Sequence, residues 1–418
     1  MEAIYKNIQI LYIVVMKLWI KYLLGIALGI LASFVLPQHV VEVLSDFSIH
    51  LGRYALMPLL FFSISVAVFR LHTEKKSISA GFWIIGTAIA LSFLIMLTGL
   101  LMGLVIPLPR IPISTLTVST VQQISIKELF LRLFPFNGFD SLLDGAYLLP
   151  CFIFAGFAGM GCTTDVNATR PVVTFIEAAS RVCYQIMSFF TEILAVGMIA
   201  ITAKWLIDFK AILKAQVYLP LLTLILLNFV LVTFVLIPVI LRVFCHELHP
   251  FKVLYASLCP VLTAFFSADS NLALSIELRH GKESLGIRRR MNAVAMPFFS
   301  VFCRGGAAAV MCISFVCILH SYSSLGISVF NMIWIGITAF VLSFLLGAFP
   351  VTGPFIAITA MCTMFGRGVT DGYLLLKAAA PILCAFAAAI DAVELMAASY
   401  IVAVKTKTIE HIEIKKYI

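Results

Sequence analysis

The sequence predicts an all-α polytopic membrane protein with about eight transmembrane helices, two re-entrant helical hairpins and an inverted repeat. Of the 418 residues, 62% are hydrophobic and only 12% are charged, whereas a soluble domain is nearer one quarter charged. The apolar residues fall in runs of about 20, the length that crosses a bilayer. Two of these runs are broken in the middle by a polar or Gly/Pro-rich tip, which a simple span does not contain.

Simple spans account for most of the apolar runs. Residues 1–15 mix charged with apolar residues and are expected to form an amphipathic helix at the membrane interface, with no signal-peptide cleavage site. Residues 129–161 form a broken apolar region, and the tail 405–418 is basic and polar. The predicted spans, in chain order, are 18–37, 51–69, 81–108, 172–206, 217–243, 293–319 and 378–404.

Basic residues set the expected orientation. The residues behind the net charge of +9 sit in short loops beside apolar runs, which is the positive-inside pattern and gives no sign of nucleic-acid binding. The basic segments 70–76, 279–290 and 405–416 are therefore placed in the cytoplasm, with both termini, and the protein in a cytoplasmic (inner) membrane. The ten cysteines show no CxxC pair and are expected to pack in reduced form.

The two broken runs share one design. Residues 251–278 are apolar at both ends around the polar tip 267–271, and residues 327–364 are centred on a tip from Gly347 to Pro354. Proline breaks a helix and glycine permits a tight turn, so each run is expected to enter the membrane, turn at mid-depth and leave on the same side. The first is predicted to enter from the cytoplasm and the second from outside. A span with an interior charge follows each hairpin, which is the inverted-repeat plan of secondary transporters.

Several segments carry a family resemblance. They are Lys17 through Pro37, Pro135 through Pro150, Leu262-Thr-Ala-Phe265 with its polar tip, Leu285-Gly286 with Met296-Pro297, Pro350 through Gly353, and Ile390-Asp391-Ala392 with Ala403-Val-Lys405. In this order and spacing they resemble the dicarboxylate/amino acid:cation symporter family of the glutamate/aspartate type, over nearly the whole chain. The resemblance implies a homotrimer in which a mobile transport part carries substrate across the membrane like an elevator, driven by sodium or protons.

The resemblance also implies a division of the chain. Residues 16–250 are expected to be mainly scaffold and trimer contact, except that the third span, about 81–108, belongs with the transport part. The transport part is expected to be residues 251–404. It comprises hairpin 1 at about 251–278, a span at about 293–319, hairpin 2 at about 327–364 and the last span at about 378–404.

The chain departs from the family at its sodium sites. The NMDGT signature of the family's seventh span is replaced here by Cys303-Arg304-Gly305-Gly306-Ala307. The third span reads GTAIALS at 86–92 where the family has a Tyr and Thr/Ser cluster, and the RTMVNVTGD signature of the last span is absent. Sodium needs several oxygen ligands, so coupling to protons, or an altered ion coupling, stands beside sodium as the expectation.

The apolar run 293–319 is interrupted at Cys303-Arg304-Gly305-Gly306. Charges inside apolar spans are costly and mark candidate sites. Arg304 suits a substrate carboxylate. Otherwise it is a fixed counter-ion for Asp269, Asp391 or Glu394, or it stands where relatives hold sodium. Asp391 and Glu394 share a helix face, so they favour a cationic or amine-bearing substrate, bind a coupling proton, or pair with Arg304. Asp269 either accepts a hydrogen bond from a substrate amine or caps the second helix of its hairpin.

The candidate substrate-binding residues lie at the two hairpin tips and in the two charged spans. They are Asp269, Ser270, Asn271, Arg304, Val351, Thr352, Gly353, Asp391 and Glu394, with Arg304, Asp391 and Glu394 also the coupling candidates. No catalytic residue, metal site or cofactor is expected beyond Na⁺ or H⁺ as coupling ion, since Walker, GxSxG and HExxH motifs are absent.

These features together predict a symporter of a small organic solute, an amino acid or a dicarboxylate, working in a lipid bilayer. The alternative is a channel, leak pathway or exchanger descended from the same fold, because the coupling motifs are eroded. A membrane-embedded enzyme acting on lipid or prenyl substrates would need a DDxxD motif or a His/Asp constellation, and neither is present.

Overall fold

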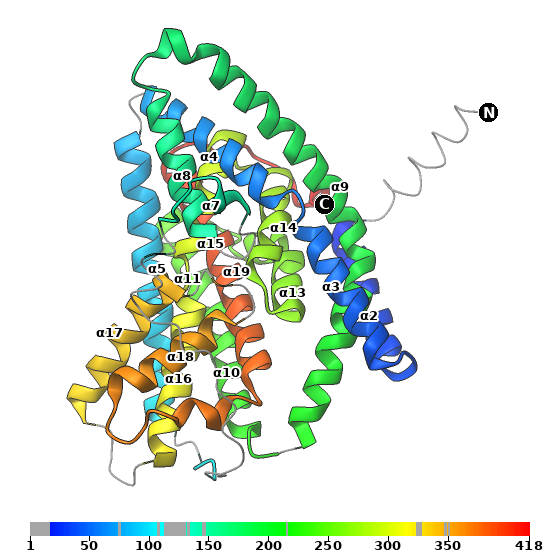
Figure 1. Ribbon diagram of the computed structural model, residues 1–418, viewed down its shortest axis with the longest axis vertical. Helices are drawn as coiled ribbons and strands as arrows, with labels where there is room; N and C mark the ends of the chain where they lie inside the picture. Colours follow the sequence, from blue (N-terminus) through cyan, green and yellow to red (C-terminus); the bar gives the residue numbers. More distant parts are fainter. Residues whose placement is uncertain are drawn as a thin grey trace.

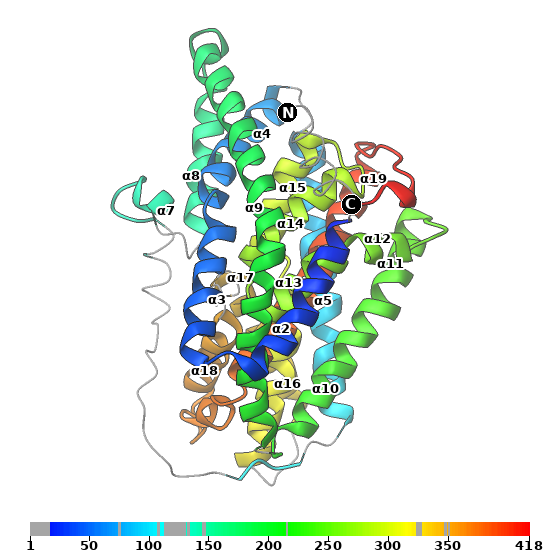
Figure 2. The same cartoon turned by 90° about the vertical axis from the view of Figure 1, so that its right-hand side faces the viewer.

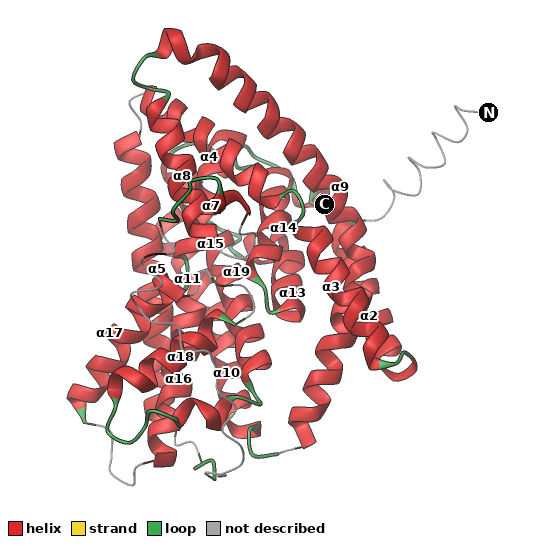
Figure 3. Ribbon diagram, viewed as in Figure 1, coloured by secondary structure: helices red, strands yellow, loops and turns green. Residues whose placement is uncertain are grey.

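The protein is a bundle of helices. The computed structural model describes residues 17–73, 77–106, 109–112, 131, 134–143, 148–214, 216–322, 328–346, 349 and 352–418. Within those ranges the ordered elements are helices joined by loops (Figure 3), and a bridge between Ile287 and Ile409 is the β-type pairing. The predicted interfacial segment 1–15 lies outside the described residues.

Figure 1 shows the arrangement of the helices. They are α2 Leu18–Val35, α3 Gln38–Arg53, α4 Leu56–Thr73, α5 Ser77–Val105, α7 Asp140–Leu143, α8 Leu148–Gly161, α9 Val166–Lys214, α10 Leu219–Leu231, the π-helical turn η1 Val232–Leu236, α11 Ile237–Cys245, α12 Phe251–Ala256, α13 Leu258–Ser267, α14 Ser270–Glu283, α15 Arg289–Phe302, α16 Gly305–Tyr322, α17 Val329–Leu346, α18 Gly353–Phe365, the 3₁₀ turn η2 Gly372–Leu376, α19 Ala380–Lys405 and the 3₁₀ turn η3 Ile414–Lys416.

Seven helical stretches in the described residues are long and apolar enough to cross a bilayer. They correspond to the predicted spans, although α3 and α4 form one stretch and α15 and α16 another. The helices α8, α13, α17 and α18 are apolar but shorter. The polytopic all-helical class is therefore confirmed, and the count of about eight spans stays a prediction.

Two of these stretches lie at the centre of the bundle. The most apolar window of α19 is fully buried and that of α15–α16 is 94% buried, whereas the window of α2 is only 28% buried. Alanine and glycine make this burial possible, because small residues let helix backbones approach closely. A Cβ on Gly99 of α5 would lie 2.6 Å from Ala309 of α16. The central helices therefore face protein on all sides, and the outer ones leave a face for lipid.

The outer layer is formed by α2, α3 and the long α9 (Figures 1 and 2). Its 49 residues give α9 a length of about 74 Å, more than twice the hydrocarbon core of a bilayer. Gly25 and Gly29 of α2 lie one turn apart, and a Cβ on either would come within 2.6 Å of a backbone carbonyl of α9. Small residues at this spacing let two membrane helices pack backbone to backbone.

The first predicted hairpin is present as α13 and α14, which pack against each other and against α19. The chain reverses at Ala268, which has a left-handed backbone (φ 53°). Asp269 then begins α14 by accepting a hydrogen bond from the backbone N–H of Asn271 at 2.9 Å, as an N-cap residue does. The ten residues of α13 span about 15 Å, half the hydrocarbon core, so the hairpin has the length of a re-entrant element.

The second predicted hairpin is present as α17 and α18, which also pack against each other. Its second helix begins at Gly353 with Pro354 in the first turn, where proline is tolerated. Half of its tip, including Pro350 and Val351, lies outside the described residues. In Figure 1, α13 and α14 lie above α17 and α18, an arrangement compatible with hairpins that enter from opposite sides.

Candidate functional site

The site is organised by a break between α15 and α16. Helix α15 ends at Phe302 and α16 begins at Gly305, so Cys303 and Arg304 lie between two helix ends. Pro297 within α15 removes one backbone hydrogen bond, and the glycine pair after Arg304 lets the next helix start in a crowded place. The sequence predicted this interruption. Its consequence is that the backbone N–H groups at the start of α16 are available inside the protein.

Arg304 joins three elements at this break. Its Nη1 donates to Ser270 Oγ on hairpin 1 at 2.5 Å and to Asp391 Oδ2 on α19 at 3.4 Å, and its Nη2 donates to the backbone carbonyl of Ser300 on α15. Of the three acids proposed as its counter-ion, the structure selects Asp391. A guanidinium held by these three acceptors is a fixed positive charge in the centre of the bundle.

The two acids of α19 lie on one face of the helix, as their spacing predicted. In the structure this face is turned toward the start of α16. Asp391 Oδ1 accepts the backbone N–H of Ala307 at 3.0 Å, and Glu394 Oε2 accepts that of Gly305 at 2.8 Å. Carboxylates are stabilised at a helix N-terminus by its unpaired N–H groups and its dipole. A Cβ on Gly306 would lie 2.7 Å from Asp391 Oδ1, so glycine is needed for the acid to reach the backbone.

Two residues absent from the predicted set belong to this region. Ser92 of α5 donates to Glu394 Oε1 at 2.5 Å. Its segment, 86–92, stood out in the sequence only because it lacks the Tyr and Thr/Ser cluster of the family. Glu277 of α14 is buried, lies within electrostatic range of Arg304 and Asp391, and its Oε2 has no hydrogen-bond partner in the described part of the chain. The sequence contained a signal for Glu277, because a carboxylate inside the predicted hairpin 251–278 marks a candidate site.

We call Arg304, Glu277, Asp391 and Glu394 the buried charge cluster. Their exposed fractions are 2%, 1%, 4% and 0%. The cluster therefore contains one guanidinium and three carboxylates, all of them buried, and Arg304 and Asp391 are in contact. Burying an unpaired ionised group is costly, and such groups bind a counter-charge or change protonation state instead. The arrangement is suited to binding a positive charge or protons.

Two neighbouring side chains at the tip of hairpin 1 have different partners. Ser270 faces Arg304, whereas the side chain of Asp269 is paired with Arg53 of the outer helix α3. Asp269 is fully buried and caps α14, so the capping role holds and its charge partner is within the protein. Asn271 is fully buried at the same turn.

The tip of hairpin 2 is only partly described. Val351 lies outside the described residues. Thr352 is exposed and Gly353 is buried at the start of α18, and no hydrogen bond in the described part of the chain joins either to the buried charge cluster. The structure therefore gathers Ser270, Arg304, Asp391 and Glu394 into one site and leaves the role of hairpin 2 a prediction.

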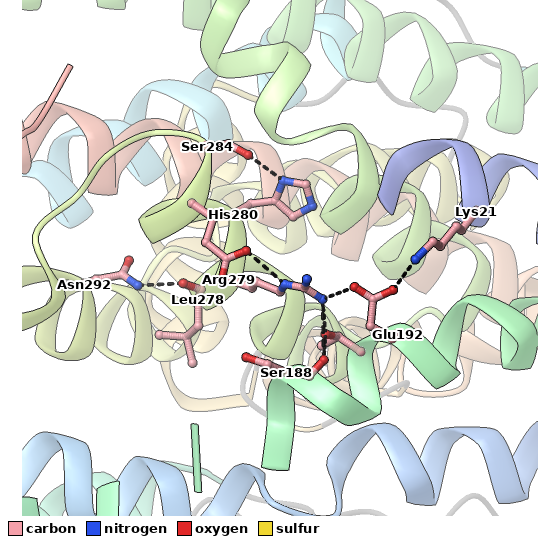
Figure 4. A network of polar contacts seen from close by, with 10 residues as sticks. Lys21, Ser188, Glu192, Leu278, Arg279, His280, Ser284 and Asn292 are labelled. Atoms are coloured by element: carbon pink, nitrogen blue, oxygen red, sulfur yellow. Dashed lines mark hydrogen bonds and ion pairs between the residues drawn. The ribbon is translucent and has the colours of Figure 1, made fainter. Parts of the chain in front are cut away.

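A second ionic link joins hairpin 1 to the outer helices (Figure 4). Arg279 of α14 contacts Glu192 of α9 at 2.7 Å, and Glu192 contacts Lys21 of α2 at 2.6 Å. Lys21 is therefore held inside an ion-pair network. Together with the Arg53–Asp269 pair, this network connects the first hairpin to α2, α3 and α9.

Comparison with known proteins agrees with this architecture. The profile of the sodium:dicarboxylate symporter family matches residues 18–405, and no curated protein matches the chain. The match covers every described helix from α2 to α19, including both hairpins and the buried charge cluster. The chain therefore belongs to the sodium:dicarboxylate symporter family, a family of transporters and not of enzymes, as its motifs predicted.

Proposed function

We propose that the protein is a secondary active transporter of a small organic solute of the amino acid or dicarboxylate class, and that the buried charge cluster sets its charge preference and its coupling. The observation that carries this proposal is the contact of Arg304 with both Ser270 of hairpin 1 and Asp391 of α19. Through it, a residue of a re-entrant tip and a charged span share one enclosed polar site, which is where transporters of inverted-repeat design hold their substrates.

The charge count in the cluster favours a positive charge as its missing component. Asp391 is balanced by Arg304 at 3.4 Å, which leaves Glu394 and Glu277 without a cationic partner in the cluster. Two uncompensated carboxylates in a water-excluded site attract protons or the ammonium group of a substrate. We therefore favour an amine-bearing substrate, proton coupling, or both, over the transport of a dicarboxylate with sodium alone.

Arg304 supports an altered use of sodium. It occupies the segment matched to the sodium signature of the family, and its guanidinium is held by Ser270, Ser300 and Asp391. A permanent cation at that point would supply the charge that a bound sodium ion supplies elsewhere. We propose that one sodium site is replaced by this side chain, so that fewer sodium ions, or none, accompany the substrate.

An elevator movement would slide the transport part, residues 251–404 with α5, against the scaffold. The packing of α5 against α16 and α19 supports its place in the moving part. The Arg53–Asp269 pair and the Glu192–Arg279 pair would then have to separate in each cycle. We propose that these two pairs hold the protein in the state seen here.

The assembly and its location complete the proposal. We propose a homotrimer whose contacts lie on α2, α3 and α9, helices that expose large apolar side chains such as Phe34, Phe47 and Phe189. We place it in a cytoplasmic membrane, with both termini and the basic segments on the cytoplasmic side. The three basic segments line one cavity, so they share one end of the molecule, as a common side of the membrane requires.

Uptake into proteoliposomes tests the function. The purified protein is given labelled amino acids and dicarboxylates with a sodium gradient, a proton gradient, both, or neither. We expect accumulation driven by an inward proton gradient and little dependence on sodium. Sodium-dependent uptake of glutamate that survives Asp391→Ala and Glu394→Ala would refute the charge argument, and equilibration without accumulation under every gradient would favour a leak pathway.

A further inference from the structure

The end of the molecule that carries the basic segments contains a cavity of about 880 Å³. It lies between the start of α5, the turn joining α14 to α15, and the chain that follows α19. Among the described residues that line it, one is an acid, Glu410. Six cationic side chains line the same cavity: Lys282, Arg288, Arg289, Arg290, Lys405 and Lys407.

The walls of this basic cavity are fixed by the backbone. Glu410 donates its backbone N–H to the carbonyl of Gly286 at 2.8 Å, and Arg288 donates to that of Thr408 at 2.9 Å. Gly286 has a left-handed backbone (φ 72°), and a Cβ there would lie 2.0 Å from the carbonyl oxygen of Glu410. Most of the cationic side chains therefore come from two segments whose backbones are hydrogen-bonded to each other. The N-terminal turn of α15 also lines the cavity, and the dipole of a helix N-terminus favours an anion.

An apolar groove lies along α5 next to the basic cavity. Its volume is about 140 Å³, and it is lined by side chains of α5, α11 and α19, among them Trp83, Leu94, Phe244 and Ile401. Lys405 of the basic cavity lies 5.8 Å from the ring centroid of Trp83 in the groove. Ile401 and Lys405 are also one helical turn apart on α19. The cationic and apolar parts therefore adjoin.

The combined dimensions match one lipid molecule. Ala80 lines the basic cavity, and Leu94 lines the far part of the groove. The step of 14 residues from Ala80 to Leu94 spans about 21 Å of helix. Half of a bilayer with its headgroups is about 20–22 Å thick. Loop charges that only orient the chain in the membrane require neither a cavity nor an apolar extension.

We propose that this site binds an anionic glycerophospholipid, with its phosphate in the basic cavity and an acyl chain in the groove. The site touches the α14–α15 turn and the end of α19, both in the proposed transport part, so a bound lipid would sit where that part meets the membrane. The inference does not depend on the transported solute. A soluble phosphate compound shares the headgroup chemistry but would leave the groove unused.

Lipid retention by the purified full-length protein tests the proposal. The protein in mild detergent is equilibrated with equal amounts of phosphatidylglycerol and phosphatidylcholine, washed, and its retained lipid measured by mass spectrometry. We expect about one phosphatidylglycerol per protomer and a preference of at least about fivefold, since each cation near an anionic lipid contributes about fivefold. Equal retention of the two lipids would overturn the proposal.

Matched variants locate the site. Replacing Lys405 and Lys407 by Gln should reduce the preference by about five- to 25-fold, whereas replacing Lys415 and Lys416, exposed cations of the same tail outside the cavity, should leave it unchanged. An equal effect of both pairs would show that only overall charge matters, which would overturn the site.

A variant in the groove distinguishes a bound lipid from a soluble phosphate compound. Gly86 lines the groove, and a Cβ there would meet nothing within 4 Å, so Gly86→Leu is expected to place its side chain in the groove. We expect this variant to lose most of its phosphatidylglycerol, and we expect excess glycerol phosphate to compete poorly. Effective competition by glycerol phosphate together with full retention by Gly86→Leu would identify a soluble ligand and overturn the lipid assignment. Because the wild-type measurement needs no variant, a folding defect cannot rescue the proposal.

Discussion

Removing the charge of Arg304 is the most direct perturbation of the buried charge cluster. In Arg304→Gln, Asp391 loses its cationic partner and keeps the backbone N–H of Ala307 at 3.0 Å. At the observed 3.4 Å and an effective dielectric constant near 20, the lost attraction is about 5 kcal/mol. Breaking one partner of a buried pair typically destabilises a protein by about 3–5 kcal/mol, so the two estimates agree.

A double-mutant cycle isolates this interaction. Arg304→Gln, Asp391→Asn and the double variant are unfolded in mixed detergent micelles and followed by circular dichroism. Because the double variant loses the pair only once, we expect it to be more stable than the sum of the single effects by about 3 kcal/mol, the upper end for residues in contact. Additive single effects would show that Arg304 and Asp391 do not interact, and the assignment of this counter-ion would be wrong.

An exposed pair provides the matched control for the cycle. Arg288 and Glu410 lie 3.3 Å apart, almost the same separation, but their side chains are 59% and 67% exposed. Solvent screening reduces such pairs to about 0–1 kcal/mol. A coupling energy as large in the control cycle as in the buried one would mean that the assay measures something other than burial of the charge pair.

Three further predictions concern the centre of the molecule and its link to the outer helices. Gly306→Ala, whose Cβ would lie 2.5 Å from a side-chain atom of α19, should destabilise the protein by about 1–3 kcal/mol in the same unfolding assay, whereas Gly156→Ala, with open space at its Cβ, should not. Neutralising either partner of the Arg53–Asp269 pair should free the hairpin from α3, so that a cysteine introduced near the tip reacts faster with a soluble maleimide; unchanged reactivity would argue against a latch. Glu277→Gln should abolish the stimulation of uptake by an inward proton gradient, measured in proteoliposomes, because the amide cannot accept the coupled proton; uptake with unchanged pH dependence would exclude Glu277 from coupling.

The sequence by itself determined the class of the protein and the positions of its breaks. Apolar run length and low charge give spans whatever their neighbours are, because the bilayer requires each crossing segment to satisfy its own backbone. The polar turn before Ser270 and the interruption at Arg304 were predicted for the same reason, since helix ends depend on a few adjacent residues. Family membership followed from the order of these local signals, and it is confirmed over residues 18–405.

The tertiary structure decided which charges meet. The sequence left three acids open as partners of Arg304, and packing chose Asp391, 87 positions away. Packing also pairs Asp269 with Arg53, 216 positions away, and brings Ser92 into a hydrogen bond with Glu394 across 302 positions. A helix is recognised from its own residues, but the direction in which it presents a side chain is fixed by the helices packed around it. Contacts between distant segments therefore became known only when those rotations and separations were in place.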